Sequence, residues 1–136
     1  MIDLANQIEA FFKRYGWDYQ RDRADLYRTG FKGQHAEYHV EIALNQEWVS
    51  FGIHPFVSRD NATEDPMAIL QFILERNHHM SLAKFGMNDD GDIALTVELP
   101  IKGFCYSYFS DALGAISHYA DEYGAFFHPA AHQIFS

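Results

Sequence analysis

Imidazole and carboxylate side chains alternate along one stretch of this sequence, and they are the groups whose types and spacing could bind a metal. They stand at every second position: His35, Glu37, His39 and Glu41. A strand places such residues on one face, about 6.7 Å apart per two-residue step. A tight turn after the strand would set His39 opposite His54, so that both imidazoles and Glu41 could approach a divalent, zinc-like ion. The alternative is a solvated polar face without an ion. The sequence favours the solvated face, and we expect no bound metal.

Other reaction chemistry is missing from the sequence. The His-x-Glu pattern of zinc deaminases occurs at residues 35–37, but that chemistry also needs a Cys-x-x-Cys pair, and Cys105 is the only cysteine. Residues 89–92 (Asp-Asp-Gly-Asp) contain carboxylates of the kind that bind calcium in EF-hand loops. A hairpin turn that uses Gly91 explains them better than a twelve-residue EF-hand loop. Cys105 lies in the aromatic run GFCYSYF without an adjacent base, which predicts a buried, inert thiol. We therefore expect no enzyme, no catalytic residue and no cofactor.

Charge limits the kinds of partner. The 136 residues carry a formal net charge of −9, and 48% of them are hydrophobic. Residues 1–34 contain six basic and five acidic side chains, whereas residues 35–136 contain four and fourteen. So few cations make nucleic acid and anionic membranes poor partners, while basic or amphipathic protein segments suit this surface. There is no secretory signal pattern and no apolar run of about 20 residues that could span a bilayer, so we expect a soluble, cytoplasmic protein.

The first half of the chain predicts a helix followed by three strands. The helix begins after Asp3, has apolar residues at helical spacing up to Tyr15, and ends at Gly16. Residues 17–22 read as a polar connection. Strands follow at residues 24–32, 36–44 and 48–57, and residues 58–65 read as a loop. The last two strands alternate clearly between apolar and polar residues and should form an antiparallel hairpin.

The second half predicts a helix, two strands and a closing helix. Pro66 suits the first turn of a helix, and this helix has apolar residues at helical spacing: Ile69, Leu70, Ile73 and Leu74. Residues 80–87 and 93–99 read as strands joined by the acidic turn, and residues 107–127 read as a helix with one apolar stripe. Together these elements predict a single α+β domain over residues 1–136. Its antiparallel five-stranded sheet and three helices follow the order α-β-β-β-α-β-β-α, with the helices mainly on one face.

This pattern resembles the YbjN family, a branch of the type III secretion chaperone-like fold. The stretch that carries the resemblance is NHHMSLAKFGMNDDGDIALTVELP, which starts at Asn77. In it an asparagine ends a helix, a strand contains Lys-Phe-Gly, an acidic Asp-Gly turn follows, and an apolar strand runs to Leu-Pro. The helix FSDALGAISHYADEYGAFF (residues 109–127) fits the closing helix of the family.

The resemblance implies a small acidic protein, often a homodimer, without known catalytic residues. Secretion chaperones of this fold hold an extended segment of a secreted client with the sheet and its flanking helix. YbjN-like proteins are associated with stress responses or regulation. A client would either add main-chain hydrogen bonds at a sheet edge or place apolar side chains in helix–sheet grooves.

Apolar side chains on the outer face of the predicted sheet suggest where such a contact lies. They are Trp48, Phe56, Met80 and Leu82, which the alternation places opposite the core-facing residues of their strands. A strand that is apolar on both sides is usually covered on both sides, so these four are our candidate dimer or partner contacts. Scattered apolar groups on an open face are the alternative explanation. The leading hypothesis is a non-catalytic, dimeric, chaperone-like module that holds a segment of an unidentified protein client. The alternatives are a YbjN-like regulator without a stoichiometric client, and a metal sensor or enzyme that uses His39, Glu41 and His54.

Overall fold

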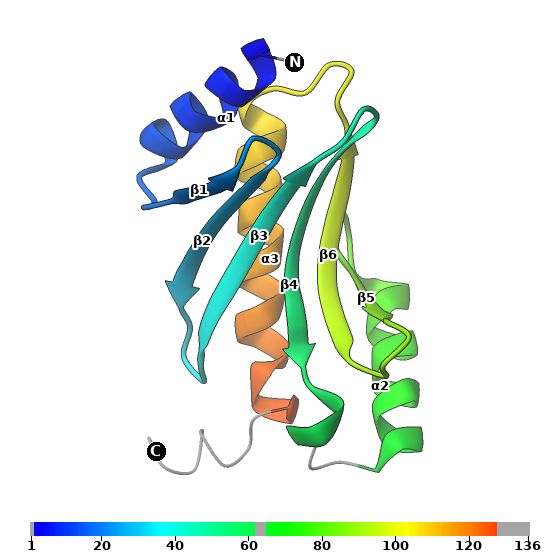
Figure 1. The fold of residues 1–136 in the computed structure, drawn as a ribbon. Helices are drawn as coiled ribbons and strands as arrows, with labels where there is room; N and C mark the ends of the chain where they lie inside the picture. Colours follow the sequence, from blue (N-terminus) through cyan, green and yellow to red (C-terminus); the bar gives the residue numbers. More distant parts are fainter. Residues whose placement is uncertain (1, 62–64, 128–136) are drawn as a thin grey trace.

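The computed structural model describes residues 2–61 and 65–127, which form one antiparallel sheet and its covering helices (Figure 1). The elements in chain order are α1 (Ile2–Tyr15), β1 (Gln20–Arg23), β2 (Leu26–Lys32), β3 (Glu37–Leu44), β4 (Trp48–Val57), the short 3₁₀ helix η1 (Arg59–Asn61), α2 (Pro66–His79), β5 (Lys84–Met87), β6 (Ile93–Pro100) and α3 (Tyr106–Phe127). The α+β class, the three helices and the antiparallel pairing agree with the prediction.

The sheet has six strands, in the order β1-β2-β3-β4-β6-β5, and the prediction of five was wrong. The additional strand is β1, which lies at the end of the segment predicted as a polar connection. All four of its residues are exposed, and it pairs with β2 through its backbone, with Gln20 opposite Arg28. A strand with no buried side chain lacks the apolar alternation on which the prediction depended.

The helices cover one face of the sheet and leave the other open. In Figure 1, α3 runs behind the central strands, α1 lies at the β1 end, and α2 lies beside and behind the edge strand β5. The first turn of α2 is stabilised by Asp65, whose carboxylate accepts a hydrogen bond from the N–H of Ala68 at 3.3 Å. We call the uncovered side of the sheet the open face.

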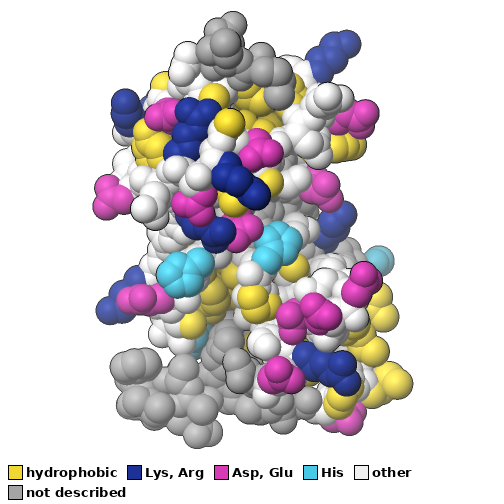
Figure 2. All heavy atoms as spheres, viewed as in Figure 1, with side chains coloured by type: hydrophobic (Ala, Val, Ile, Leu, Met, Phe, Trp, Pro, Cys, Tyr) yellow, Lys and Arg dark blue, Asp and Glu magenta, His cyan; other side chains and the backbone are white. Residues whose placement is uncertain are grey.

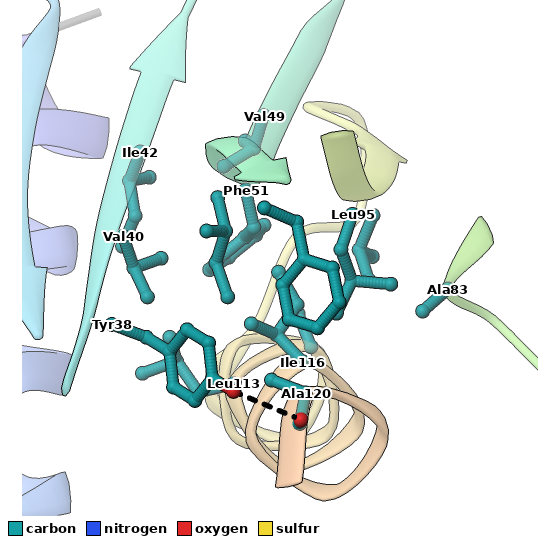
Figure 3. Packing of buried hydrophobic residues seen from close by; sticks show 14 of the residues in the cluster. Tyr38, Val40, Ile42, Val49, Phe51, Ala83, Leu95, Leu113, Ile116 and Ala120 are labelled. Atoms are coloured by element: carbon teal, nitrogen blue, oxygen red, sulfur yellow. Dashed lines mark hydrogen bonds between the residues drawn. The ribbon is translucent and has the colours of Figure 1, made fainter. Parts of the chain in front are cut away.

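The core lies between the sheet and α3. Figure 3 shows side chains of β3, β4 and β6 packed against Leu113, Ile116 and Ala120 of the helix. Tyr38 of β3 reaches α3, where its hydroxyl donates to the carbonyl of Ala120 at 3.3 Å (Figure 3). Burial, with a smaller contribution from the charge of Asp121, raises the pKa of Tyr38 to about 12. The hydroxyl therefore keeps its proton and its role as a donor at neutral pH.

Phe56 lies in this core, and its predicted outward orientation was wrong. It is 4% exposed and packs against aromatic rings of three other elements: Tyr38, Phe85 and Phe127. The pairing of β4 with β6 shifts between Ile53 and Val57, so three β4 residues there face a single residue of β6. An irregularity of this kind breaks the two-residue alternation, and Phe56 and Val57 both end on the helix side.

The boundary between α2 and β5 also differs from the prediction of a strand over residues 80–87. The helix continues to His79, and the strand begins only at Lys84. Between them the N–H of Ala83 donates to the carbonyl of Ser81 at 2.7 Å, and Leu82 has a φ of 69°. This hydrogen bond across one residue with positive φ is that of a classic γ-turn, a rare and strained conformation.

Candidate protein-docking surface

Helix α2 has two apolar faces, and the sheet and α3 cover only one of them. Ile69 and Ile73 are buried against the core. Met67 and Leu74 point away from it, and they are 68% and 69% exposed. Burying a leucine stabilises a protein by about 1.5–3 kcal/mol relative to exposing it, so two such side chains in solvent on one helix form a candidate contact surface.

The strand beside α2 and the turn before it add two more exposed apolar residues. Met87 at the end of β5 is 50% exposed, and Leu82 in the γ-turn is 48% exposed. We call the surface formed by Met67, Leu74, Leu82 and Met87 the α2–β5 flank. Among the described residues, four of the six exposed large hydrophobic side chains belong to it. Figure 2 shows apolar side chains gathered along the lower right edge of the molecule, where Figure 1 places α2.

A groove runs into the flank between α2 and the β5–β6 turn. Its volume is about 570 Å³, and its lining is mainly apolar: Val57, Arg59, Pro66, Ile69, Leu70, Met87, Asn88, Asp89, Gly91 and Ile93. The turn is shaped by the side chain of Asn88, whose Oδ1 accepts from the N–H groups of Asp90 and Asp92 at 2.9 and 3.0 Å. Gly91 has a φ of 85°. These are the features of the hairpin turn that the sequence predicted.

The flank carries little charge in an acidic molecule. Residues 66–87 contain one acidic side chain, Glu75, and two basic ones, Arg76 and Lys84, which gives +1 at pH 7. The whole chain carries −9, so the remaining residues together carry −10. A second acidic molecule can approach this surface with less repulsion than it would meet over residues 35–65 or 88–136.

The open face of the sheet is polar by contrast. Arg28 of β2 donates to Glu41 of β3 at 2.6 Å and also pairs with Asp22 of β1, and Lys84 lies 3.6 Å from Glu98 of β6. Figure 2 shows acidic and basic side chains interleaved across this side of the molecule. Among the described residues, most of the exposed large hydrophobic side chains therefore lie at the flank and not on the open face, where the sequence had suggested them.

The four residues predicted as contacts do not form one surface. Leu82 belongs to the α2–β5 flank, and Met80, partly buried at the end of α2, lies next to it. Trp48 is 39% exposed but pairs with Pro100 at the last residue of β6, whereas Met87 of the flank pairs with Ile93 at the first. Phe56 is in the core. The predicted surface is thus divided between the flank, the far end of the sheet and the interior.

Sequence reasoning missed Met67, Leu74 and Met87 as exposed residues. Leu74 was assigned to the same stripe as Ile73, although neighbouring residues differ by about 100° around a helix. A signal was present, because the apolar residues at positions 67, 69, 70, 72, 73 and 74 together cover more than half of the helix circumference, which is wider than one buried stripe requires. Met87 sits at an edge strand, where the core-facing side of the sheet ends.

The histidine and glutamate side chains proposed for a metal lie on the open face. His39 and His54 both line a shallow hollow of about 180 Å³. Glu41 is engaged by Arg28, and the ring of His54 folds over Gly52, where an added Cβ would collide with the imidazole. Across residues 2–61 and 65–127, no group of three His, Cys, Asp or Glu side chains is placed to hold a metal ion. The metal hypothesis therefore has no support in this geometry.

Cys105 is exposed, and the prediction of a buried thiol was wrong. It precedes the first residue of α3, and its carbonyl accepts from the N–H of Phe109 at 3.1 Å. The aromatic residues around it did not predict its burial, because Phe104 and Phe109 enter the core while Cys105 between them faces solvent.

The fold places the protein in a known structural class. Twelve chains of solved structures match it. One, from the crystal structure of the ExsC–ExsE complex, has a TM-score of 0.69 at 15% identity and covers 93% of this chain and 94% of its own. Another is the crystal structure of YbjN, a putative transcription regulator from E. coli, with a TM-score of 0.55 at 17% identity, which covers 90% and 92%. The fold is the type III secretion chaperone-like fold that the sequence resembled.

The chain itself belongs to the YbjN family. The family model, described as a putative bacterial sensory transduction regulator, matches residues 4–129. No curated protein matches the sequence. In the part of the chain that the structure describes, no helix is long and apolar enough to cross a membrane.

Proposed function

We propose that this protein is a non-catalytic, cytoplasmic protein-binding module that forms a homodimer through its α2–β5 flank and holds a segment of a partner protein. The observation that carries the proposal is the exposure of Met67 and Leu74 on α2 and of Leu82 and Met87 at the two ends of the adjacent strand β5. Contiguous exposed apolar surface on a folded protein marks an interaction site.

Charge supports a second copy as the occupant of the flank. A copy brings −9, and the near-neutral flank is a place where two such molecules can meet. The partner segment is a different case, because it has to suit a surface that is acidic outside the flank. A basic or amphipathic segment meets that requirement, with its apolar side chains in a groove such as the one between α2 and the β5–β6 turn.

The kinship supports a role in protein contacts. The family is described as putative sensory transduction regulators, and a chain of the same fold was crystallised in the ExsC–ExsE complex. Neither description names a reaction, and the described residues here offer no metal-binding group.

The test is a charge placed on the flank. Leu74→Glu and Leu82→Asp should convert a dimer to a monomer in light scattering, because two carboxylates would be buried at a symmetric interface. Both positions are exposed, so circular dichroism should show the folded state unchanged. Tyr108→Glu is the matched control, because Tyr108 is an exposed large side chain of α3, 45% accessible, outside the flank.

Three results would contradict the proposal. The first is a wild-type monomer at high concentration, and the second is a Leu74→Glu variant that keeps the dimer. In the third, Tyr108→Glu dissociates the dimer as strongly as Leu74→Glu.

A regulatory role without a stoichiometric client is the second candidate, favoured by the family description. With a net charge of −9, such a protein would regulate through protein contacts and not by binding DNA directly. Affinity capture of the tagged protein from native extract separates the two roles. One partner in stoichiometric amount, lost with flank variants and retained with Tyr108→Glu, supports the chaperone-like role. A bare dimer supports the regulatory one.

A further inference from the structure

The outer edge of β5 is closed by a side chain. The amide nitrogen Nδ2 of Asn77 donates to the carbonyl of Phe85 at 3.0 Å, and the N–H of Phe85 donates to Oδ1 of Asn77 at 2.8 Å. One carboxamide thus satisfies both backbone groups of a single strand residue. This is the pair of hydrogen bonds that a residue of an added antiparallel strand would make.

The position of Phe85 makes this contact an edge contact. β5 is the last strand of the sheet and pairs only with β6, where Phe85 lies opposite Leu95. In an antiparallel ladder, successive residues direct their backbone groups alternately toward the neighbour and away from it. Because the N–H and C=O of Phe85 both reach Asn77 on α2, they point away from β6, to the side where a seventh strand would pair.

The next outward-directed N–H toward the start of the strand is also engaged, since that of Ala83 donates to Ser81 at 2.7 Å. At the other end of the strand, Met87 and Leu70 of α2 both line the groove described above. Helix α2 therefore runs alongside the β5 edge, with Asn77 as the residue that bonds to it.

This edge requires protection more than the other one does. β5 reads Lys-Phe-Gly-Met and is bordered by the exposed Leu82, whereas β1 reads Gln-Arg-Asp-Arg. β1 also has an irregular pairing between Arg21 and Arg23, and the guanidinium of Arg21 donates to the carbonyl of Ala24 at 3.1 Å. Charged residues, bulges and short length protect an edge strand from pairing with other chains. β5 has little charge, so its protection comes from α2.

We propose that Asn77 is the residue that closes the β5 edge to strand addition, so that partners of the α2–β5 flank dock through side chains and not by extending the sheet. The second half of this statement rests on the proposed function, while the first half does not. At the β5 edge, this leaves the helix–sheet groove, and not strand addition, as the way in which a client could bind.

The test compares Asn77→Ala with the wild-type protein by two measurements on the full chain. Amide hydrogen exchange should show Phe85 N–H protected in the wild type and at least tenfold faster in the variant, because its acceptor is gone. Sedimentation velocity and infrared spectroscopy should show concentration-dependent assembly of the variant beyond the wild-type state, with an intermolecular β-sheet band. Gln71→Ala is the matched control, because Gln71 is an exposed residue of the same helix whose side-chain contact is with Glu75 at 3.5 Å.

A second variant keeps the test decisive if Asn77→Ala folds poorly. Asn77→Asp retains an oxygen for the Phe85 N–H but loses the donor to its carbonyl, so protection of the N–H should persist while the carbonyl is left unpaired. Unchanged exchange of Phe85 in Asn77→Ala, or no assembly beyond that of Gln71→Ala, would overturn the proposal. Those results would leave the flank dimer intact, whereas a dimer that survives Leu74→Glu would remove the flank and leave the closed edge.

Discussion

At the scale of single residues, two positions hold an amino acid whose backbone preference does not suit its local conformation. Leu82 occupies the centre of a γ-turn with a φ of 69°, where glycine would be unstrained. Gly124 lies inside α3, where alanine is the better helix former by about 1 kcal/mol. For Gly124 the reason is the nearby hydroxyl of Tyr38, and for Leu82 it is the exposed side chain on the α2–β5 flank.

At position 82, we expect the glycine variant to be more stable than the alanine variant, which inverts the usual order. At an ordinary position alanine is at least as stabilising as glycine, but here Leu82→Ala keeps the strained backbone that Leu82→Gly relieves. A non-glycine residue with positive φ costs about 1–2 kcal/mol, so the glycine variant should be more stable by about 1 kcal/mol in urea unfolding. Both variants remove the same exposed side chain, so light scattering should show both weakening the dimer. A glycine variant less stable than the alanine variant would contradict the strained turn.

The effect of Gly124→Ala on stability should change sign when the hydroxyl of Tyr38 is removed. An added Cβ at Gly124 would lie 2.5 Å from the Tyr38 hydroxyl oxygen, too close for contact. Gly124→Ala should therefore destabilise the protein by about 1–3 kcal/mol, despite its better helix propensity. Tyr38→Phe removes that oxygen and one hydrogen bond, at a cost of about 1 kcal/mol. In the Tyr38→Phe background, Gly124→Ala should be neutral or stabilising in urea unfolding. Equal destabilisation in both backgrounds would place the conflict elsewhere.

At the scale of elements, the sequence predicted what depends on buried periodic residues and failed where backbone pairing decides. The hairpin of β3 and β4 and the helix α3 lie within a residue or so of their predicted ranges. β1 was missed because none of its side chains is buried. The start of β5 was placed four residues early because Met80 and Leu82 continue an apolar pattern through a turn.

The candidate surface followed the same division. The exposure of Leu82 was predicted from the sequence, because an apolar residue out of phase with the core can be recognised without coordinates. Leu74 could not be separated from Ile73 by composition, since the choice between two apolar faces of α2 depends on how the helix docks on the sheet. The hydrogen bonds between Asn77 and Phe85 join a helix to a strand eight residues later, and no local pattern specifies that contact.

At the scale of the whole molecule, the α2–β5 flank is the main exposed apolar surface. The helices cover one face of the sheet, the other face is polar, and both edges of the sheet are protected. The interleaved ion pairs of the open face contribute little to stability, but they make that face unsuited to an apolar partner. The electrostatic cost of self-association through the flank is then the general repulsion between two molecules that carry −9 each.

Salt should therefore strengthen the proposed dimer. Ions screen the repulsion between like-charged molecules, with a Debye length of about 10 Å at 0.1 M, while contacts among Met67, Leu74, Leu82 and Met87 involve no charge to screen. The dissociation constant from sedimentation equilibrium should fall several-fold from low to high sodium chloride, and further in sulfate, which favours apolar burial. The Tyr108→Glu control should follow the same trend. A dimer held instead by charged side chains, such as those of the open face, would weaken with salt, and that result would move the interface away from the flank.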